Sequence, residues 1–181
     1  MRKVFFQMFV SADGFIDGPK GAWDIDWHVV GDGFQDYVSD MMESIDAILL
    51  GRKTYEGFSQ YWATSTEPEA AAMNGLPKIV FSRTLTKTEW SNSRLVQCDA
   101  AEEVARLKQE GGKDLAIFGS NDLAASLAQQ GLIDEFRLFV NPVILGGGTS
   151  VLSHVKDRIS LNLVSAKPLW DGVVLLTYVP A

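Results

Sequence analysis

Short apolar runs alternate with helical patterns over the first part of the chain. Ala47–Leu50 contains four apolar residues in succession, which is the length of a strand buried on both faces and too short for a core helix. The run stops at Gly51, and Tyr55, Phe58 and Trp62 then follow at i, i+3 and i+7, a spacing that predicts one face of a helix. The pattern therefore predicts a strand that ends at a glycine and passes directly into a helix.

The same alternation recurs along the chain and then changes character. Strands are expected over residues 3–11, 47–50, 78–84, 95–96 and 115–118, and helices over residues 34–44, 53–62, 99–110 and 120–130. The remaining part contains three strands without helices between them, at residues 136–145, 160–167 and 173–178. Alternating strands and helices favour a parallel sheet, and the strand-rich end favours antiparallel strands at one edge. The sequence predicts one α/β domain over residues 1–181, with a mostly parallel central sheet and antiparallel C-terminal strands.

Composition excludes several classes of function. The net charge is -7, and the isoelectric point is near 4.8. This balance argues against general binding of nucleic acids or membrane surfaces, which requires a basic face. Any phosphate-bearing ligand must therefore be held by local cations against the overall field of the protein.

Cysteine, histidine and the N-terminal segment limit compartment and metal chemistry. The single cysteine, Cys98, fits a reducing compartment, so we expect a cytoplasmic protein. The apolar stretch Val4–Val10 is interrupted by Gln7 and alternates, which predicts a first strand and not an export signal. His28 and His154 lie far apart without the spacing of metal ligands, so no metal site is expected.

A long irregular segment separates the first strand from the first helix. It begins with two Asp-Gly turn signals around Asp13 and Gly14 and continues past Trp23 and Trp27. Loops of about 20 residues in a compact domain are commonly functional. A second glycine-rich segment, 146–148, resembles a phosphate loop, but it lies between strands and not before a helix, which favours a turn.

Residues suited to phosphate binding follow three of the expected strands. They are Gly51-Arg52-Lys53-Thr54, Ser82-Arg83 and Gly119-Ser120-Asn121. The N-terminus of a helix presents unpaired N–H groups and the positive end of the helix dipole, and both attract anions. Ligands of open α/β sheets bind beyond the carboxyl ends of the strands, so these three segments are expected at one edge. The simpler alternative is that each is a turn with solvated cations.

The order of several motifs resembles the dihydrofolate reductase-like superfamily. The residues that carry the resemblance are Ser11-x-Asp13-Gly14-x-Ile16, Leu50-Gly51-Arg52-Lys53-Thr54, Phe81-Ser82-Arg83, Phe118-Gly119-Ser120 and Asn141-Pro142-Val143-x-Leu145-Gly146-x-Gly148. The resemblance extends over nearly the whole chain. Within the superfamily it is greatest to the reductase domain at the C-terminus of the bifunctional riboflavin-biosynthesis protein RibD, and it implies a three-layer dihydrofolate reductase-like fold.

The resemblance also implies NADPH as cofactor and hydride transfer to a pterin- or pyrimidine-like ring. The implied cofactor ligands are Gly51, Arg52, Lys53 and Thr54 for the phosphates, Ser82 and Arg83 for the adenosine side with its 2′-phosphate, Gly119, Ser120, Asn121 and Leu123 for the pyrophosphate, and Val10 and Ile16 for the nicotinamide. One departure concerns the substrate: riboflavin-pathway reductases carry an acid before a Gly-Gly pair where this chain has Phe118-Gly119-Ser120.

Hydride transfer to a C=N or C=O group requires a proton donor near the nicotinamide. A carboxyl group partly buried by aromatic residues has a raised pKa that suits this role. Asp32 and Asp13 are the candidates, with Asp24 and Asp26 behind them. Asp13 is equally well explained as a turn former beside Gly14, and Asp32 as the cap of the following helix. Trp23 and Trp27 either stack on the flat substrate or close the core.

Three hypotheses of function remain open. The first is an NADPH-dependent reductase of a small heteroaromatic substrate, and the second is a module that binds or senses the cofactor without catalysis. The third is a structural dimer whose strand ends are merely turns. The apolar final strands, especially residues 136–145, lead us to expect a homodimer that pairs them across a two-fold axis.

Overall fold

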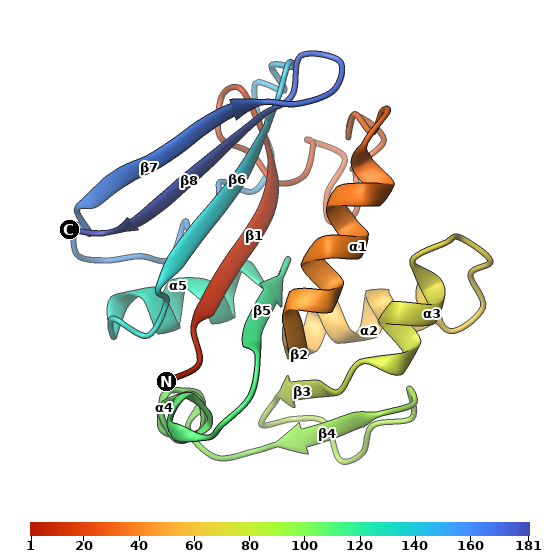
Figure 1. Cartoon of the computed structure of the whole chain (residues 1–181), viewed down its shortest axis with the longest axis vertical. Coiled ribbons are helices and arrows are strands. Elements are labelled where there is room, and N and C mark those ends of the chain that lie inside the picture. The colour runs from red at the N-terminus through yellow and green to blue at the C-terminus, as the bar shows by residue number, and fades with distance from the viewer.

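The computed structural model describes residues 1–181, which form one eight-stranded sheet with helices on both faces (Figure 1). The strands are β1 (Val4–Ser11), β2 (Ile45–Gly51), β3 (Lys78–Phe81), β4 (Ser93–Val96), β5 (Asp114–Phe118), β6 (Glu135–Asn141), β7 (Leu161–Pro168) and β8 (Val174–Pro180). The helices are α1 (Phe34–Ser44), α2 (Arg52–Trp62), α3 (Ala70–Gly75), α4 (Ala100–Gln109) and α5 (Asn121–Gln129). The strands lie in the order β4-β3-β2-β5-β1-β6-β8-β7.

The direction of the strands divides the sheet into two parts. The strands from β4 to β6 in this order pair in parallel, whereas β8 runs antiparallel to both β6 and β7. The predicted fold class is therefore confirmed. One detail differs: the strand expected at residues 136–145 belongs to the parallel part, because β6 runs alongside β1 with Phe6 opposite Phe136. Antiparallel pairing begins only with β8.

Alternate side chains of β1 enter two separate cores, as expected for a three-layer fold. Val4 and Phe6 pack in the cluster that contains the buried residues of α4 and α5. Phe5 packs on the opposite face, in the cluster built with α1, α2 and α3. Phe5 and Phe6 point to opposite faces and are both buried, so the central strand is covered on both faces. No helix of the protein has the length and apolar character that a membrane span requires.

The segments between elements also follow the sequence pattern. α2 begins at Arg52, directly after the strand that ends at Gly51. The segment between β1 and α1 contains no helix and no strand, as predicted for a long loop. The glycine-rich segment 146–148 is a turn, in which Gly146 and Gly148 have positive φ and no helix follows.

The strand that was expected to form a dimer contact does not lie at an edge of the sheet. β6 lies between β1 and β8 and is hydrogen-bonded to both, so it cannot pair with a second copy through its edge. The expectation that residues 136–145 pair across a two-fold axis is contradicted in this form. The outer strand on this side is β7, and all its residues are exposed.

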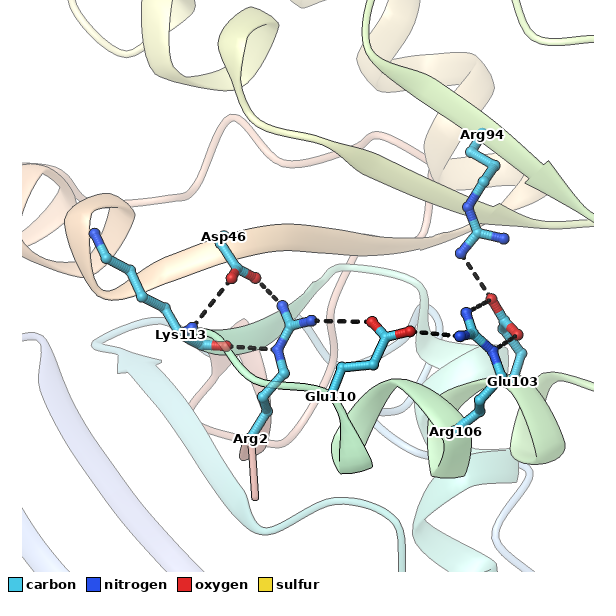
Figure 2. Close-up of polar contacts among 7 residues, drawn as sticks. All are labelled: Arg2, Asp46, Arg94, Glu103, Arg106, Glu110 and Lys113. Carbon is cyan, nitrogen blue, oxygen red and sulfur yellow. Dashed lines mark hydrogen bonds and ion pairs between the residues drawn. The ribbon is translucent and has the colours of Figure 1, made fainter.

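A network of charged residues lies at the amino ends of the strands (Figure 2). Its ion pairs alternate in sign from Asp46 to Arg94, and Lys113 joins them through its backbone N–H, which donates to the Asp46 carboxylate. In sequence of contact, the residues are Lys113, Asp46, Arg2, Glu110, Arg106, Glu103 and Arg94. They come from β2, β4, α4 and the segments that precede β1 and β5. Hydrogen bonds from Arg106 and Arg94 lower the pKa of Glu103 to about 2. This network joins elements that are distant in sequence.

Candidate functional site

The three segments suited to phosphate binding lie at one edge of the sheet, at the carboxyl ends of neighbouring strands. β2 lies between β3 and β5 in parallel pairing, with Gly51 opposite Phe81 and Leu49 opposite Ile117. The residues that follow these strand ends begin α2, the turn after β3, and α5. The structure therefore brings together what the sequence pattern predicted to share an edge.

Two hydrogen bonds join the beginnings of α2 and α5. The Gly51 N–H donates to Ser120 Oγ at 2.9 Å, and the Ser120 N–H donates to Thr54 Oγ1 at 2.9 Å. Thr54 and Ser120 are both buried, so their hydroxyl groups serve this contact between helices. The two residues expected as ligands thus act first as positioning residues, which hold the two helix N-termini side by side.

The backbone between β5 and α5 explains why glycine precedes Ser120. Gly119 has φ +61, and a Cβ atom added there would lie 3.1 Å from Thr54 Cγ2. Ser120 is also left-handed, with φ 45. The left-handed region strains residues that carry a Cβ atom, and this contact leaves no room for one. Gly119 is therefore required by the approach of the chain to α2.

The N-terminus of α2 has the features of an anion site. No side chain caps it, and its first turn contains no acidic residue, so its N–H groups have no competing carboxylate. Arg52 forms a solvent-exposed pair with Glu56 at 3.1 Å. Lys53 is exposed and forms no ion pair, and the same holds for Arg83 after β3. This edge therefore carries two unpaired cations.

Ser82 and Asn121 are held by contacts within the protein. Ser82 Oγ accepts hydrogen bonds from the N–H groups of Thr84 and Leu85, and so it closes the turn after β3. The Asn121 side chain is buried, where it accepts a hydrogen bond from Leu152 N at 2.6 Å and donates one to Ser150 O. Its amide group fastens the segment that follows the glycine-rich turn.

The apolar residues expected near the cofactor are part of the core. The Leu123 side chain is buried with those of α4, α5 and β1, so it packs in the core, and the expected role of Leu123 in framing the pyrophosphate at the start of α5 stays a prediction. Val10 is buried in the same cluster, and Ile16 packs against it from the loop. Both lie on the α4 and α5 face, close to where β1 ends at Ser11.

Asp13 does not have the environment expected of a proton donor. Its carboxylate accepts hydrogen bonds from Ser11 Oγ at 2.7 Å, from Leu145 N at 3.1 Å and from Gly146 N at 2.8 Å. These donors, Ser11 first, lower the pKa of Asp13, whereas the prediction required a raised pKa. The structure corrects this expectation: Asp13 is an ionised group that joins the loop after β1 to the glycine-rich turn.

The other candidate acids lie in the same loop. Asp32 is exposed, and it does not cap α1, whose N-cap is Gly33 without a side-chain hydrogen bond. The expected burial of Asp32 by aromatic residues is therefore absent. Asp24 accepts a hydrogen bond from Lys20 N at 3.1 Å, and Asp26 lies 3.9 Å from Lys20 Nζ. These two acids shape the turn that contains Lys20.

The two tryptophans of the loop face different neighbours. Trp23 is half-exposed and lies over Gly57, with its ring 6.0 Å from that of Phe58. Trp27 donates its indole N–H to Asp24 O at 2.8 Å, and its ring meets the edge of His28 at 4.5 Å. They do not form one stacking surface, because Trp23 packs on α2 whereas Trp27 contacts residues of its own loop.

His28 is a feature that the sequence analysis considered only as a metal ligand. Its ring stacks on Phe9 at 4.7 Å, and its buried Nε2 atom has no hydrogen-bond partner. Burial lowers the pKa of His28 to about 4, so the ring is neutral at neutral pH. No group of three His, Cys, Asp or Glu side chains is arranged to hold a metal ion.

A second feature missed by sequence reasoning lies on β1 itself. Tyr37 on α1 donates a hydrogen bond to Gln7 Oε1 at 2.8 Å, next to Arg137 on β6. Burial raises the pKa of Tyr37 despite the nearby guanidinium. The available signal was Gln7, a polar residue that interrupts an otherwise apolar strand.

Solved structures define the class to which this architecture belongs. Dihydrofolate reductase from Enterococcus faecalis, in complex with NADP(H), has a TM-score of 0.63 at 13% identity, covering 98% of this chain and 96% of that one. The Thermotoga maritima diaminohydroxyphosphoribosylaminopyrimidine deaminase/5-amino-6-(5-phosphoribosylamino)uracil reductase has a TM-score of 0.71 at 17% identity, covering 99% of this chain and 57% of that one. The fold is therefore that of the dihydrofolate reductase class.

Sequence similarity gives the particular family. The RibD C-terminal domain family matches residues 2–175, and the chain belongs to this family, which confirms the resemblance seen in the motifs. A relative, the uncharacterized protein YyaP of Bacillus subtilis strain 168, is 33% identical over 184 residues, covering 98% of this chain and 94% of that protein.

Proposed function

We propose that this protein is an NADPH-dependent reductase that transfers hydride to a pterin- or pyrimidine-like small molecule. The observation that carries the proposal is the carboxyl edge of β2, β3 and β5, where an uncapped helix N-terminus lies with the unpaired cations Lys53 and Arg83. Membership of the RibD C-terminal domain family supports it. Two proteins of the same fold are described as a uracil reductase and as a reductase with bound NADP(H).

The residues at this edge fit the phosphates of a dinucleotide. The N–H groups at the start of α2, together with Lys53, suit the pyrophosphate, and Arg83 suits the 2′-phosphate that distinguishes NADPH from NADH. Gly119 keeps the backbone close to α2, where a side chain would intrude. When bound, NADPH supplies the hydride, and the chain contributes orientation and charge compensation.

A thermal shift with NADPH and NADH side by side tests the proposal. A ligand at a hundredfold excess over its Kd stabilises by about 2.7 kcal/mol. For a domain of this size, that corresponds to a rise in Tm of roughly 5–10 °C. We expect the larger rise with NADPH, and the Arg83→Gln variant should lose the preference for NADPH while keeping its own Tm. No shift with either nucleotide would refute the cofactor assignment.

A second candidate function is a module that binds or senses NADPH without catalysis. The environments of the two candidate proton donors favour this function. The Asp13 carboxylate is ionised and already accepts hydrogen bonds from Ser11, Leu145 and Gly146, and Asp32 is exposed. The Asp32→Asn variant separates the candidates. An enzyme that uses Asp32 loses turnover and keeps its affinity for NADPH, whereas a binding module oxidises no NADPH with either sequence.

We also propose that the protein is a homodimer, joined through β7 and not through β6. β7 is the outer strand, and its neighbouring residues Leu163 and Val164 are 57% and 61% exposed. An unprotected apolar edge strand readily pairs with another strand. Light scattering at micromolar concentration should give about twice the 19.9 kDa of one chain. Val164→Glu should give a single chain, and a wild-type mass near that of one chain would refute the dimer.

A further inference from the structure

Three polar side chains from three elements meet on the face of the sheet beside α1. Gln7 on β1 and Arg137 on β6 are opposite each other in the parallel register. Tyr37 reaches them from α1, with its hydroxyl 2.8 Å from Gln7 Oε1. All three are partly exposed. We name this group, together with Glu135, the β1/β6 niche.

Arg137 is held in one orientation. Its guanidinium lies over the ring of Phe5, with Cζ 3.8 Å from the ring centroid. Its Nε–H donates to Glu135 Oε1 at 2.5 Å. The terminal nitrogen atoms form no ion pair with a carboxylate. An arginine fixed by stacking and by one carboxylate presents its remaining N–H donors without further loss of side-chain entropy.

The charge of the niche is balanced. Glu135 compensates Arg137, so the niche has little attraction for a phosphate or a carboxylate. It offers guanidinium N–H donors, a carboxamide that donates and accepts, and a phenol that does either. This combination matches an uncharged edge of alternating carbonyl and N–H groups, as found on pteridine and pyrimidine rings.

Aromatic residues connect the niche to the carboxyl edge of the sheet. Phe9 and Phe139 are the next inward-facing pair along β1 and β6, and their rings stack at 4.9 Å. The Tyr37 ring meets Phe139 edge-on at 5.1 Å. A flat ring bound at the niche would therefore have apolar neighbours on the side toward the carboxyl ends of the strands.

We propose that Gln7, Tyr37 and Arg137 determine substrate specificity, by binding the carbonyl and N–H edge of a flat heteroaromatic ring. This inference rests on the proposed function, since it names the substrate side of the same site. Truncation of Tyr37 or Gln7 removes one hydrogen-bonding group from the niche. Tyr37→Phe keeps the ring that packs on Phe139, so its effect is limited to the hydroxyl group.

Binding of two matched probes tests the proposal with the full chain. Pteridine-2,4-dione carries carbonyl and N–H groups on a flat double ring, and quinoxaline is a flat double ring without them. By titration calorimetry, we expect the dione to bind wild type at least about tenfold more tightly than quinoxaline. Tyr37→Phe and Gln7→Leu should each weaken binding of the dione by about tenfold and leave quinoxaline unchanged.

The controls separate this proposal from the two simpler explanations. Tyr61→Phe, which removes an exposed hydroxyl on α2, should leave both probes unaffected. A purely structural niche would weaken both probes alike or neither, and equal binding of the two probes by wild type would overturn the proposal. NADPH binding is measured in parallel: a protein that binds NADPH but not the dione refutes the niche alone, whereas binding of the dione without NADPH refutes the proposed function alone.

Discussion

Charged side chains are paired at the amino ends of the parallel strands and unpaired at their carboxyl ends. At the amino ends, seven charged residues form one continuous chain of contacts, and the Arg2 guanidinium is buried within it. At the carboxyl ends, Lys53 and Arg83 are exposed without ion-pair partners, and the N-terminus of α2 has no acidic residue in its first turn. A charge that is already paired stabilises the fold, whereas an unpaired one remains available to a ligand. The difference assigns stability to the amino ends of the strands and leaves free cations at the carboxyl ends, where we propose that the cofactor binds.

The largest expected loss of stability comes from breaking the charged network at the amino ends of the strands. Arg2→Ala removes the buried guanidinium that contacts Asp46 and Glu110. Arg2 also donates a hydrogen bond from Nε to Lys113 O at 2.7 Å. Hydrogen bonds of charged groups contribute about 1.5–3 kcal/mol each, and water solvates the half-exposed Asp46 and Glu110 in the variant, so the free energy of unfolding should fall by about 3 kcal/mol. Urea denaturation measures the loss, and NADPH affinity of the folded protein should not change. Lys87→Ala, which breaks a fully exposed pair with Glu89, should cost far less than Arg2→Ala.

A smaller effect is expected from breaking the carboxyl edge at Gly119. Gly119→Ala places a Cβ atom in a left-handed residue and 3.1 Å from Thr54, and it should cost about 2 kcal/mol of stability. Because it separates α2 from α5, it should also weaken NADPH binding. Gly131→Ala is the matched control, since Gly131 has φ +66 and open space around the added atom. Equal losses of stability and binding in both variants would show that the contact with Thr54 is unimportant.

The smallest expected loss of stability comes from removing the charge of one acidic residue, Glu103, in the network at the amino ends of the strands. The pKa of Glu103 in the folded protein is about 2, below its ordinary value of 4.5. Its stabilisation is therefore present above about pH 4.5 and is lost as the pH falls toward 2. Glu103→Gln should lower stability by about 1 kcal/mol at pH 7, since Arg94 and Arg106 are half-exposed. Denaturation across this range should show the two proteins converge at pH 2, and a constant difference would contradict the assignment.

The sequence was most informative about strand ends and least about side-chain direction. Gly51, Arg83 and Gly119 could be placed at one edge, because the carboxyl ends of neighbouring parallel strands must lie together. The roles of Asp13 and Asn121 could not be predicted, because their hydrogen-bond partners are remote in sequence: Asp13 binds Gly146, and Asn121 binds Leu152. A local pattern contains no information about which distant backbone groups will approach.

The β1/β6 niche shows a related limit. Gln7 is a polar residue within an apolar strand, which indicates that a polar partner lies nearby. Its partner Tyr37 belongs by its spacing to the apolar stripe of α1, so the sequence does not identify it as that partner. Arg137 becomes its neighbour only because β6 pairs in parallel with β1. The succession of strands without helices favoured an antiparallel position for β6, and that position would not bring Arg137 beside Gln7.

The central position of β1 also has a consequence for synthesis of the protein. Lys3 bonds to Asp114 and Val4 bonds to Asp134, which are 111 and 130 positions further along the chain. β1 is synthesised before β5 and β6 and must therefore wait until both have emerged, so Phe5 and Phe6 have no paired strand beside them during that time. Proteins dominated by such distant pairings fold slowly. The nascent segment that contains β1 is thus especially exposed to aggregation and to capture by chaperones.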